Sequence, residues 1–268
     1  FMLSLNQIKT YYPEQLHTYE RFIIRKYLQY KILEIIFETP FNRKLSFLGG
    51  TCLRIVHQNS RFSEDLDFDN FNLSVDDFNA ITQTVRQELE RLGYDVEMKN
   101  ILKGVYHCHI RFPELLYNEG FSNHKEEKIL IQLDTDAHDF IYQPDKPILN
   151  KFDVFTQVNV TPIDILLAQK FYALLNRKRN KGRDFFDIVF LLGKDVKPNF
   201  DYLKAKIWIE KPGELKSIVL QKCLELDMKE MVSDVKPFLF NPKDEKKILL
   251  FPEFIEQTKL LQFAGLQG

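Results

Sequence analysis

The chain has 268 residues, with 37 Lys or Arg, 38 Asp or Glu and a formal net charge of −1. This length allows one large domain or two modest ones and is ample for a hydrophobic core. The balance of charge excludes a strong overall field for nucleic acid, so any basic surface must be local.

The cysteines and the apolar runs indicate the compartment. Cys52, Cys108 and Cys223 are odd in number and widely spaced, which argues against a disulfide scaffold and fits the reducing cytoplasm. We find no signal peptide and no apolar run long enough to cross a bilayer. We therefore expect a cytoplasmic protein without a membrane partner.

Residues 3–40 are expected to form helices, because apolar side chains recur there at helical spacing. Pro13 stands where a helix can begin, since its missing N–H costs nothing in a first turn, and Pro40 ends the helical pattern. Arg25 and Lys26 are expected on a solvated face, with an orientation toward an active-site mouth as the alternative.

The most informative stretch begins with a short apolar run that stops at Gly49 and Gly50 and continues through Thr51 into CLRIVHQ, a predicted short helix. Glycines allow a sharp turn and a close approach to a ligand, because they carry no Cβ. A strand that breaks at glycines into a helix directs backbone N–H groups and the positive end of the helix dipole to one spot. That spot favours phosphate.

An acidic run, SEDLDFD, follows within the same stretch. In a strand Asp65 and Asp67 point the same way, with Asp69 behind them, while Leu66 and Phe68 face the core. Carboxylates on one face repel each other unless a cation lies between them, and oxygen ligands of this kind suit Mg²⁺ bound with phosphates. The alternative is a solvated edge strand whose charges discourage aggregation.

These two motifs resemble a known family. GGT-x-LR at 49–54 and R-x-SEDLDF at 61–68 are similar to the AbiE-type nucleotidyltransferase toxins, effectors of bacterial abortive-infection and toxin–antitoxin pairs within the DNA polymerase β-like superfamily. The resemblance implies an α/β (α+β) nucleotidyltransferase fold, with a mixed β-sheet flanked by helices and a mainly helical C-terminal region. It also implies nucleotide binding by Gly49, Gly50, Thr51 and Arg54. Thr51 replaces the serine common in the superfamily and keeps its hydroxyl.

The next segments extend the predicted sheet. A helix capped by Ser74 is expected to run to about Leu92, and residues 94–98 and 105–112 read as a hairpin with a turn near Gly104. His107 and His109 share a strand face, so a metal site must be considered. No third soft ligand stands at the usual spacing, which favours two half-exposed strand histidines.

Residues 128–136 form an apolar strand that ends in acids. Because nucleotidyltransferase folds carry a third carboxylate on a neighbouring strand, Asp134 is our candidate, with Asp136 as the register-shifted alternative. It would complete a metal cluster with Asp65 and Asp67, or remove the proton of the attacking hydroxyl. The other interpretation is that Asp134 only ends the strand.

After short strands and loops at 144–160, Thr161 is expected to cap a helix with Pro162 in its first position. The helix leads into KFYALLNRKRNKGRDFFDI, which resembles the family's K-x-x-A-L…R…RD-x-x-D signature. By that resemblance Lys170 contacts the phosphates of the nucleotide and Asp184 is a further essential acid. Alone, Lys170 would read as an exposed helix lysine.

Two further residues of the signature, Arg183 and Asp187, look like supports, and Asp187 could pair a helix-side Arg or Lys. The signature also contains a dense basic run (Arg177, Lys178, Arg179, Lys181, Arg183). It fits a solvated turn or a seat for an RNA backbone. From about residue 196 the sequence predicts helices, with a turn at 211–213, and no independent site.

The sequence therefore predicts N-terminal helices over 1–42, a catalytic domain over 43–155, and a helical domain over 156–268 that contributes Lys170 and Asp184. The expected reaction moves a nucleoside monophosphate from an NTP to an acceptor hydroxyl, with Mg²⁺ or Mn²⁺ as cofactor. Family resemblance implies an RNA acceptor, such as the tRNA 3′ end, and a cognate antitoxin. The alternatives are a degenerate nucleotide- or RNA-binding module and a metal-dependent phosphohydrolase, which would need more histidine ligands.

Overall fold

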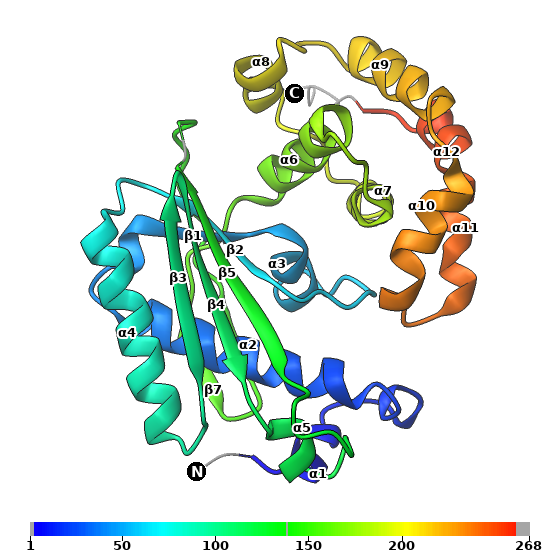
Figure 1. The fold of residues 1–268 in the computed structure, drawn as a ribbon. Coiled ribbons are helices and arrows are strands. Elements are labelled where there is room, and N and C mark those ends of the chain that lie inside the picture. The colour runs from blue at the N-terminus through cyan, green and yellow to red at the C-terminus, as the bar shows by residue number, and fades with distance from the viewer. Residues whose placement is uncertain (1–2, 138, 261–268) are drawn as a thin grey trace, which may run out of the picture. The chain divides into compact units, whose positions relative to one another are not determined.

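The computed structural model describes residues 3–137 and 139–260 and divides the chain into two compact units (Figure 1). The first unit comprises the residues up to His57 and Phe62–Thr161, and the second comprises Gln58–Arg61 and the residues from Pro162 onward. The segment 58–61 therefore interrupts the sequence of the first unit but belongs to the second.

A five-stranded mixed sheet organises the first unit, with the strand order β1-β2-β5-β4-β3 (Figure 1). The pair β2/β5 is parallel and the other three pairs are antiparallel. A separate hairpin joins β6 and β7. The strands are β1 (Leu45–Leu48), β2 (Leu66–Asn70), β3 (Glu97–Lys103), β4 (Val105–Phe112), β5 (Ile129–Ala137), β6 (Ile148–Lys151) and β7 (Val154–Gln157).

The register of the sheet brings four sequence-distant residues into one row. Asp67 on β2 pairs with Leu48 on β1 and with Asp134 on β5. Asp134 in turn pairs with His107 on β4. Paired residues on adjacent strands point to the same face of a sheet. The predicted α/β fold is therefore confirmed, with Asp67 and Asp134 at neighbouring positions.

Helices α2 and α4 pack against each other and contact the strands of this sheet (Figure 1). Helix α2 is buried on most of its circumference although it carries several charged residues, because strand β7 of the β6–β7 hairpin contacts it in addition to the sheet. The helical elements of the first unit are α1 (Leu5–Lys9), η1 (Glu14–Leu16), α2 (Glu20–Glu38), η2 (Asn42–Lys44), α3 (Gly49–Ile55), α4 (Val75–Arg91) and α5 (Leu115–Asn118).

Several element boundaries differ from the sequence-based expectation. Pro13 precedes only a 3₁₀ turn, and the long helix begins at Glu20. The predicted strand at 94–98 begins only at Glu97. The glycine pair does not form a turn before a helix, since α3 begins at Gly49 itself.

The second unit is helical in its described part, which ends at residue 260. The first turn of α7 approaches α10 so closely that a Cβ on Gly182 would overlap the carbonyl oxygen of Met231. The Gly182 N–H donates to Asp234 Oδ2 at 2.9 Å. The elements are α6 (Ile163–Asn176), α7 (Gly182–Leu192), α8 (Phe200–Ile207), α9 (Pro212–Leu224), α10 (Met228–Val235), η3 (Lys236–Phe238), η4 (Pro242–Glu245), α11 (Lys246–Leu249) and α12 (Phe251–Gln257).

Two predicted features of the helices α6 and α9 are wrong. Thr161 does not cap α6, whose N-cap is Pro162, because the Thr161 hydroxyl instead contacts the hydroxyls of Tyr142 and Ser46. Pro212 lies in the first turn of α9 rather than in a connecting turn, a position where its missing N–H is harmless. Among the described helices, none combines the length and apolar character needed to cross a bilayer.

The cap of α4 provides a test of the local structure. Ser74 Oγ accepts a hydrogen bond from Asp77 N at 3.1 Å, and Asp77 Oδ2 accepts one from Ser74 N at 3.0 Å. We expect Ser74→Ala to lower the free energy of unfolding by about 1 kcal/mol, the usual loss for an N-cap, in urea denaturation. Thr84→Ala, which removes a hydroxyl bonded to Ala80 O within the same helix, should not destabilise. Equal losses in both variants would contradict the capping assignment.

Candidate functional site

The junction between β1 and α3 lies directly against the carboxylate of Asp67. Gly49 has φ +78°, a left-handed conformation that favours glycine. A Cβ at this position would overlap the Asp67 carboxylate. The first glycine of the GGT motif is therefore required both by its backbone conformation and by the position of Asp67. Gly50 follows within the first turn of α3.

Thr51 connects the glycine motif to the acidic motif. Its side chain is buried, and its hydroxyl donates to the backbone carbonyl of Asp65 at 2.5 Å. The hydroxyl thus ties the first turn of α3 to the residue that precedes β2. In this structure it supports the position of Asp65, a role that the sequence did not reveal because the two residues belong to different elements.

Polar contacts hold the Asp134 carboxylate in place on the row formed with Asp67. Gln132 Nε2 donates to both Asp134 oxygens at 2.9 Å, and His107 Nδ1 lies 2.7 Å from Oδ1. An ionised carboxylate only accepts hydrogen bonds, so Nδ1 carries the proton in this contact. Asp136, the alternative third acid, instead pairs with Asp69 in the register.

Asp69 has a different environment from Asp67. The Tyr142 hydroxyl donates to Asp69 Oδ2 at 2.6 Å and contacts the Thr161 hydroxyl at 2.8 Å. Burial raises the pKa of Tyr142, and the charge of Asp69 raises it further, so the phenol stays protonated as a donor. Asp69 is buried. These contacts make Asp69 a support of the end of β2.

Helix α2 supports the segment that enters the acidic motif. Gln29 Nε2 donates to the carbonyl oxygens of Ser63 and Glu64, at 3.2 and 2.8 Å. Arg25 Nη1 lies 2.5 Å from Glu64 Oε1. Arg25 is therefore not on a purely solvated face, because it pairs with the residue next to Asp65.

The first unit has the donor chemistry that a hard cation requires. Asp67 and Asp134 contribute oxygen ligands at paired positions, and the bare Cα of Gly49 leaves the space that the Asp67 carboxylate occupies. Within residues 3–137 and 139–260, however, no three His, Cys, Asp or Glu side chains gather closely enough to hold a metal ion. The metal set of Asp65, Asp67 and Asp134 thus remains a prediction, and the histidine pair forms no such site in the described chain.

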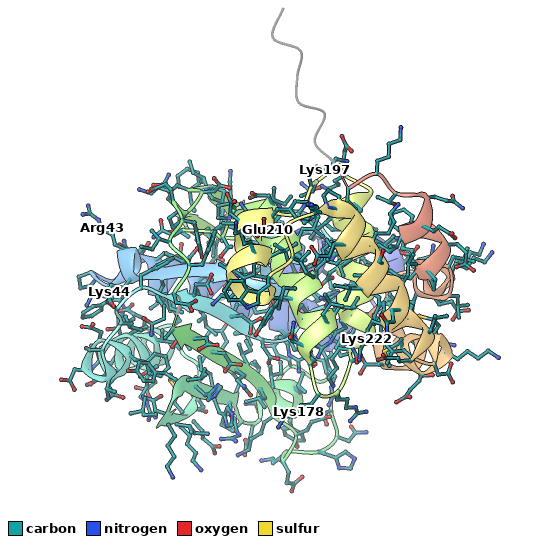
Figure 2. The ribbon with its side chains drawn as sticks, turned by 90° about the horizontal axis from the view of Figure 1, so that it is seen from above. Arg43, Lys44, Lys178, Lys197, Glu210 and Lys222 are labelled. Carbon is teal, nitrogen blue, oxygen red and sulfur yellow. The ribbon has the colours of Figure 1, made fainter. Side chains whose placement is uncertain are left out.

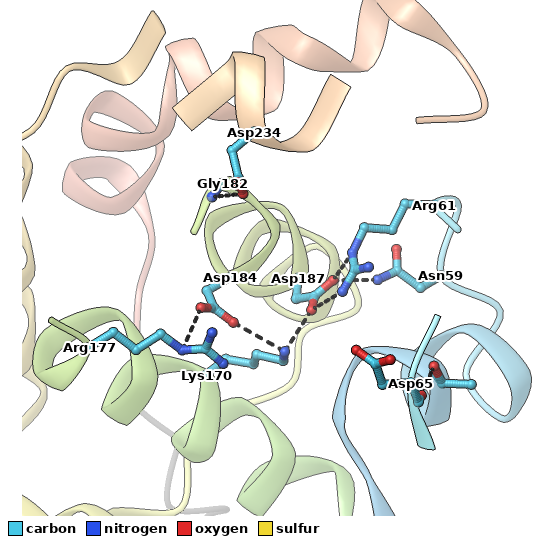
Figure 3. Close-up of polar contacts among 10 residues, drawn as sticks. Asn59, Arg61, Asp65, Lys170, Arg177, Gly182, Asp184, Asp187 and Asp234 are labelled. Carbon is cyan, nitrogen blue, oxygen red and sulfur yellow. Dashed lines mark hydrogen bonds and ion pairs between the residues drawn. The ribbon is translucent and has the colours of Figure 1, made fainter. Parts of the chain in front are cut away.

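Residues of the second signature motif join Asn59 and Arg61 in a largely buried ionic network of the second unit. We call it the Asp187 cluster (Asn59, Arg61, Lys170, Arg177, Asp184, Asp187; Figure 3). Asp187 is 0% exposed. Its Oδ1 accepts from Arg61 Nε and Asn59 Nδ2, both at 2.7 Å. Its Oδ2 lies 2.6 Å from Arg61 Nη2 and 2.9 Å from Lys170 Nζ. The prediction that Asp187 pairs a cation is confirmed.

Lys170 and Asp184 are brought together in the same cluster. Lys170 is 9% exposed, and its Nζ lies 3.2 Å from Asp184 Oδ1. Arg177 Nε lies 3.3 Å from the other oxygen of Asp184 (Figure 3). Lys170 is therefore not a solvated helix lysine. Arg183, by contrast, lies outside this cluster, with its guanidinium 4.9 Å from the ring of Phe238.

The charges of the cluster compensate one another. Burial alone would raise the pKa of Asp187, but Arg61 and Lys170 outweigh it and lower the pKa to about 2. Burial would lower the pKa of Lys170, yet Asp187 and Asp184 raise it. Both groups are consequently charged at neutral pH, and each depends on its partners for that charge.

The basic run is split between burial and exposure. Arg177, Lys178 and Arg179 are exposed in the loop after α6, where Figure 2 shows Lys178 at the surface. Lys181 and Arg183 are half-buried. The exposed part is thus confined to the first three residues.

The sequence analysis did not identify the residues that contact the carboxylates of Asp187 (Asn59 and Arg61) and Asp134 (Gln132 and His107). Arg61 stands in the first quoted motif and Asp187 in the second, so the sequence contained both ends of this ion pair without linking them. Gln132 and Asp134 are two residues apart on one strand, a spacing that the period of a strand could have revealed. The contact of His107 depends on the strand register, for which the sequence carries no signal.

We expect Gly49→Ala to destabilise the first unit and to displace the Asp67 carboxylate. The left-handed backbone costs a side-chain-bearing residue about 1–2 kcal/mol, and the overlap with Asp67 adds to that loss. Gly104→Ala is the matched control, because Gly104 has φ +76° and nothing within 4 Å of its Cβ position. Urea denaturation should show a larger loss for Gly49→Ala, and equal losses would contradict the close approach of Asp67.

Removal of one charge from the Asp187 cluster should destabilise the second unit. Asp187→Asn removes the carboxylate that the buried Arg61 and Lys170 share, a loss of about 3–5 kcal/mol for a buried pair. The pKa of Asp187 is near 3.9 in the unfolded chain and about 2 in the folded protein. The charged carboxylate therefore contributes fully to the free energy of unfolding above pH 4, and this contribution is lost as the pH falls through 2. Urea unfolding and hydrogen exchange of α7 measure the effect.

The control for this variant is Asp195→Asn, whose carboxylate pairs with Lys197 at 2.6 Å but is 91% exposed. We expect its unfolding to match the wild type, because exposed ion pairs contribute little. If Asp187→Asn also matched the wild type at neutral pH, the cluster would not stabilise α7.

Comparisons with known proteins agree with this arrangement. The model of the family described as "Nucleotidyl transferase AbiEii toxin, Type IV TA system" matches residues 31–248. The crystal structure of JHP933 from Helicobacter pylori has a TM-score of 0.52 at 18% identity, covering 88% of this chain and 91% of that chain. A second H. pylori structure, named "putative nucleotidyltransferase", has a TM-score of 0.51 at 17% identity, with coverage of 88% and 94%.

No curated protein matches the chain significantly. At these identities the two solved structures show a shared fold, consistent with the mixed sheet of the first unit. The family match extends over both signature motifs. The chain therefore belongs to the AbiEii family of nucleotidyl transferase toxins of type IV toxin–antitoxin systems.

Proposed function

We propose that this toxin transfers a nucleoside monophosphate from an NTP to an acceptor hydroxyl of RNA, with the tRNA 3′ end as the candidate acceptor. The hydroxyl oxygen attacks the α-phosphorus, the bond between the α-phosphorus and the bridging oxygen breaks, and pyrophosphate leaves. The hydroxyl proton passes to a carboxylate of the site.

One observation carries the proposal. Asp67 and Asp134 are register partners on adjacent parallel strands, and Asp67 lies against Gly49 where β1 passes into α3. Two acids side by side repel each other, so the arrangement favours a cation between them, and a cation in turn attracts a phosphate. Family membership supports nucleotidyl transfer as the chemistry that uses it.

In the proposal Asp65, Asp67 and Asp134 hold Mg²⁺ (or Mn²⁺), which when bound neutralises charge on the phosphates. Gly49 leaves room for the Asp67 carboxylate, and Gly50 lets the nucleotide approach the backbone. The Thr51 hydroxyl keeps Asp65 in place through its bond to the Asp65 carbonyl.

Asp134 has two roles open to it, metal ligand or base. The hydrogen bonds from Gln132 and His107 fix the orientation of its carboxylate, and either role benefits from a fixed orientation. As a base, Asp134 would take the proton of the acceptor hydroxyl, with the His107 ring already in contact with it.

Lys170 is proposed to neutralise phosphate charge, with Asp184 as its support. A lysine ammonium has three N–H donors, and the carboxylates of Asp184 and Asp187 account for two of them. The third is left for a phosphate oxygen. Because these carboxylates raise the pKa of Lys170, the ammonium stays charged although it is buried.

The proposed RNA acceptor is supported by the exposed cations Arg177, Lys178 and Arg179, since RNA binding depends on phosphate contacts. The family implies a cognate antitoxin as a partner. A degenerate module that only binds nucleotide or RNA is the second candidate. It is less consistent with two adjacent carboxylates, which repel each other when no cation is bound.

The test is incubation of the purified protein with each α-labelled NTP, Mg²⁺ and total tRNA, followed by gel electrophoresis. We expect label on RNA with the wild type, and a decrease of at least about 100-fold in Asp67→Asn, the scale for losing one active-site electrostatic group. Asp95→Asn, which alters an exposed acid of the same unit, should retain full activity.

Other outcomes separate the alternatives. Label absent from RNA, with NTP bound in the presence of Mg²⁺, would direct the search to a protein or small-molecule acceptor. No NTP binding would favour the degenerate module. Release of inorganic phosphate instead of pyrophosphate would identify a phosphohydrolase.

A further inference from the structure

A second group of cations in the first unit differs from the Asp187 cluster in having no acid among its members. We call it the Lys26 cluster (Tyr12, Lys26, Tyr30, Arg54, Lys151). Lys26 of α2 is only 5% exposed. Neither Lys26 nor Lys151 forms an ion pair or hydrogen bond with any residue in the described ranges. Buried lysines are normally paired.

The two ammonium groups lie beside the same aromatic ring. Lys26 Nζ is 5.9 Å from the centroid of Tyr12 and 5.8 Å from that of Tyr30. Lys151 Nζ is 4.8 Å from the Tyr12 centroid. The faces of these rings stabilise a cation weakly but do not neutralise its charge.

Arg54 of α3 adds a third positive charge. Burial lowers the pKa of Lys26 well below its usual value, and the charges of Arg54 and Lys151 lower it further. Burial also lowers the pKa of Lys151, with Arg54 as the second cause. The three cations therefore destabilise one another, as the carboxylates of the candidate site do.

The Lys26 cluster also contains a buried hydrogen-bond donor without a partner. Within the described residues, the buried hydroxyl of Tyr12 has no hydrogen-bond partner, and the side chain is 7% exposed. An unsatisfied buried polar group costs free energy and is rare in folded proteins. A negatively charged hydrogen-bond acceptor would pair with the Tyr12 hydroxyl and with the ammonium groups of Lys26 and Lys151.

We propose that the Lys26 cluster binds an oxyanion of the phosphate class, with Lys26, Arg54 and Lys151 as cations and the Tyr12 hydroxyl as a donor. A phosphate group supplies the negative charge and the acceptor oxygens that Lys26, Lys151 and the Tyr12 hydroxyl lack among the described residues. No acidic side chain in the described first unit does so for Lys26 or Lys151.

The anion has two possible sources with the same chemistry. Arg54 follows Gly50 by four residues of α3, about 6 Å along a helix axis, which is within the length of a polyphosphate chain. The first source is therefore the phosphate chain of the nucleotide, and this assignment rests on the proposed function. The second source is free phosphate or pyrophosphate, which does not depend on it.

The test measures pyrophosphate binding by titration calorimetry without divalent metal. Wild-type protein should bind pyrophosphate, and Lys26→Met and Lys151→Met should each weaken binding by roughly 10-fold or more, the loss of one charge-assisted hydrogen bond. Lys146→Met is the control, because Lys146 is exposed and precedes the same hairpin, and it should bind as the wild type does.

Tyr12→Phe keeps the ring and removes only the hydroxyl, so it tests the site even if Lys26→Met misfolds, which circular dichroism would reveal. It should weaken pyrophosphate binding by several-fold. Absence of pyrophosphate binding by the wild type, or equal binding by the wild type, Lys26→Met and Tyr12→Phe, would overturn the proposal.

Competition distinguishes the two sources. If the nucleotide's phosphate chain occupies the cluster, NTP and pyrophosphate exclude each other and Lys26→Met weakens NTP more than NMP. If free phosphate is the ligand, pyrophosphate binds while NTP is bound. Asp67→Asn should still bind pyrophosphate. Failure of RNA labelling with intact, Lys26-dependent pyrophosphate binding would overturn the proposed transfer and leave this site standing.

Discussion

The approach of the Asp67 carboxylate to the backbone of Gly49 is the constraint on which the first unit's candidate site depends. It requires a residue without Cβ in a left-handed conformation at the point where β1 passes into α3. The same register that places Asp67 beside β1 places it opposite Asp134 on β5. One backbone arrangement therefore brings the glycine motif and both strand carboxylates together.

Charge compensation divides the buried ionic groups of the protein into two kinds. Lys170 and Arg61 lie in the interior of the second unit with Asp184 and Asp187 as partners, and such groups mainly stabilise a unique arrangement. Lys26 is also buried, but it lacks an acidic partner among the described residues. The cations of the Asp187 cluster are neutralised by acids of the protein itself, whereas those of the Lys26 cluster are proposed to be neutralised by a bound anion.

The segment 58–61 belongs to the second unit, although its chain neighbours on both sides belong to the first. Arg61 is held by Asp187 in the second unit, and only three residues separate it in sequence from Asp65. The two signature motifs are therefore linked by a direct contact in the folded protein. Their distant ends, Arg61 and Asp187, form one buried ion pair, which explains why both a basic and an acidic residue belong to them.

The sequence by itself determined the α/β class, the capped helix α4, the β3–β4 hairpin and the family, because these depend on periodicity, capping residues and short motifs. Asp67 lies within β2, whereas Asp65 directly precedes that strand, so the shared face of these two carboxylates stays a prediction. Only the tertiary structure decided that Asp134 rather than Asp136 lies opposite Asp67, that His107 contacts Asp134, and that Thr161 bonds to Tyr142 instead of capping α6. Pairing between strands that are distant in the sequence and long-range hydrogen bonds fix these features, and no local turn sets the register of β2 against β5.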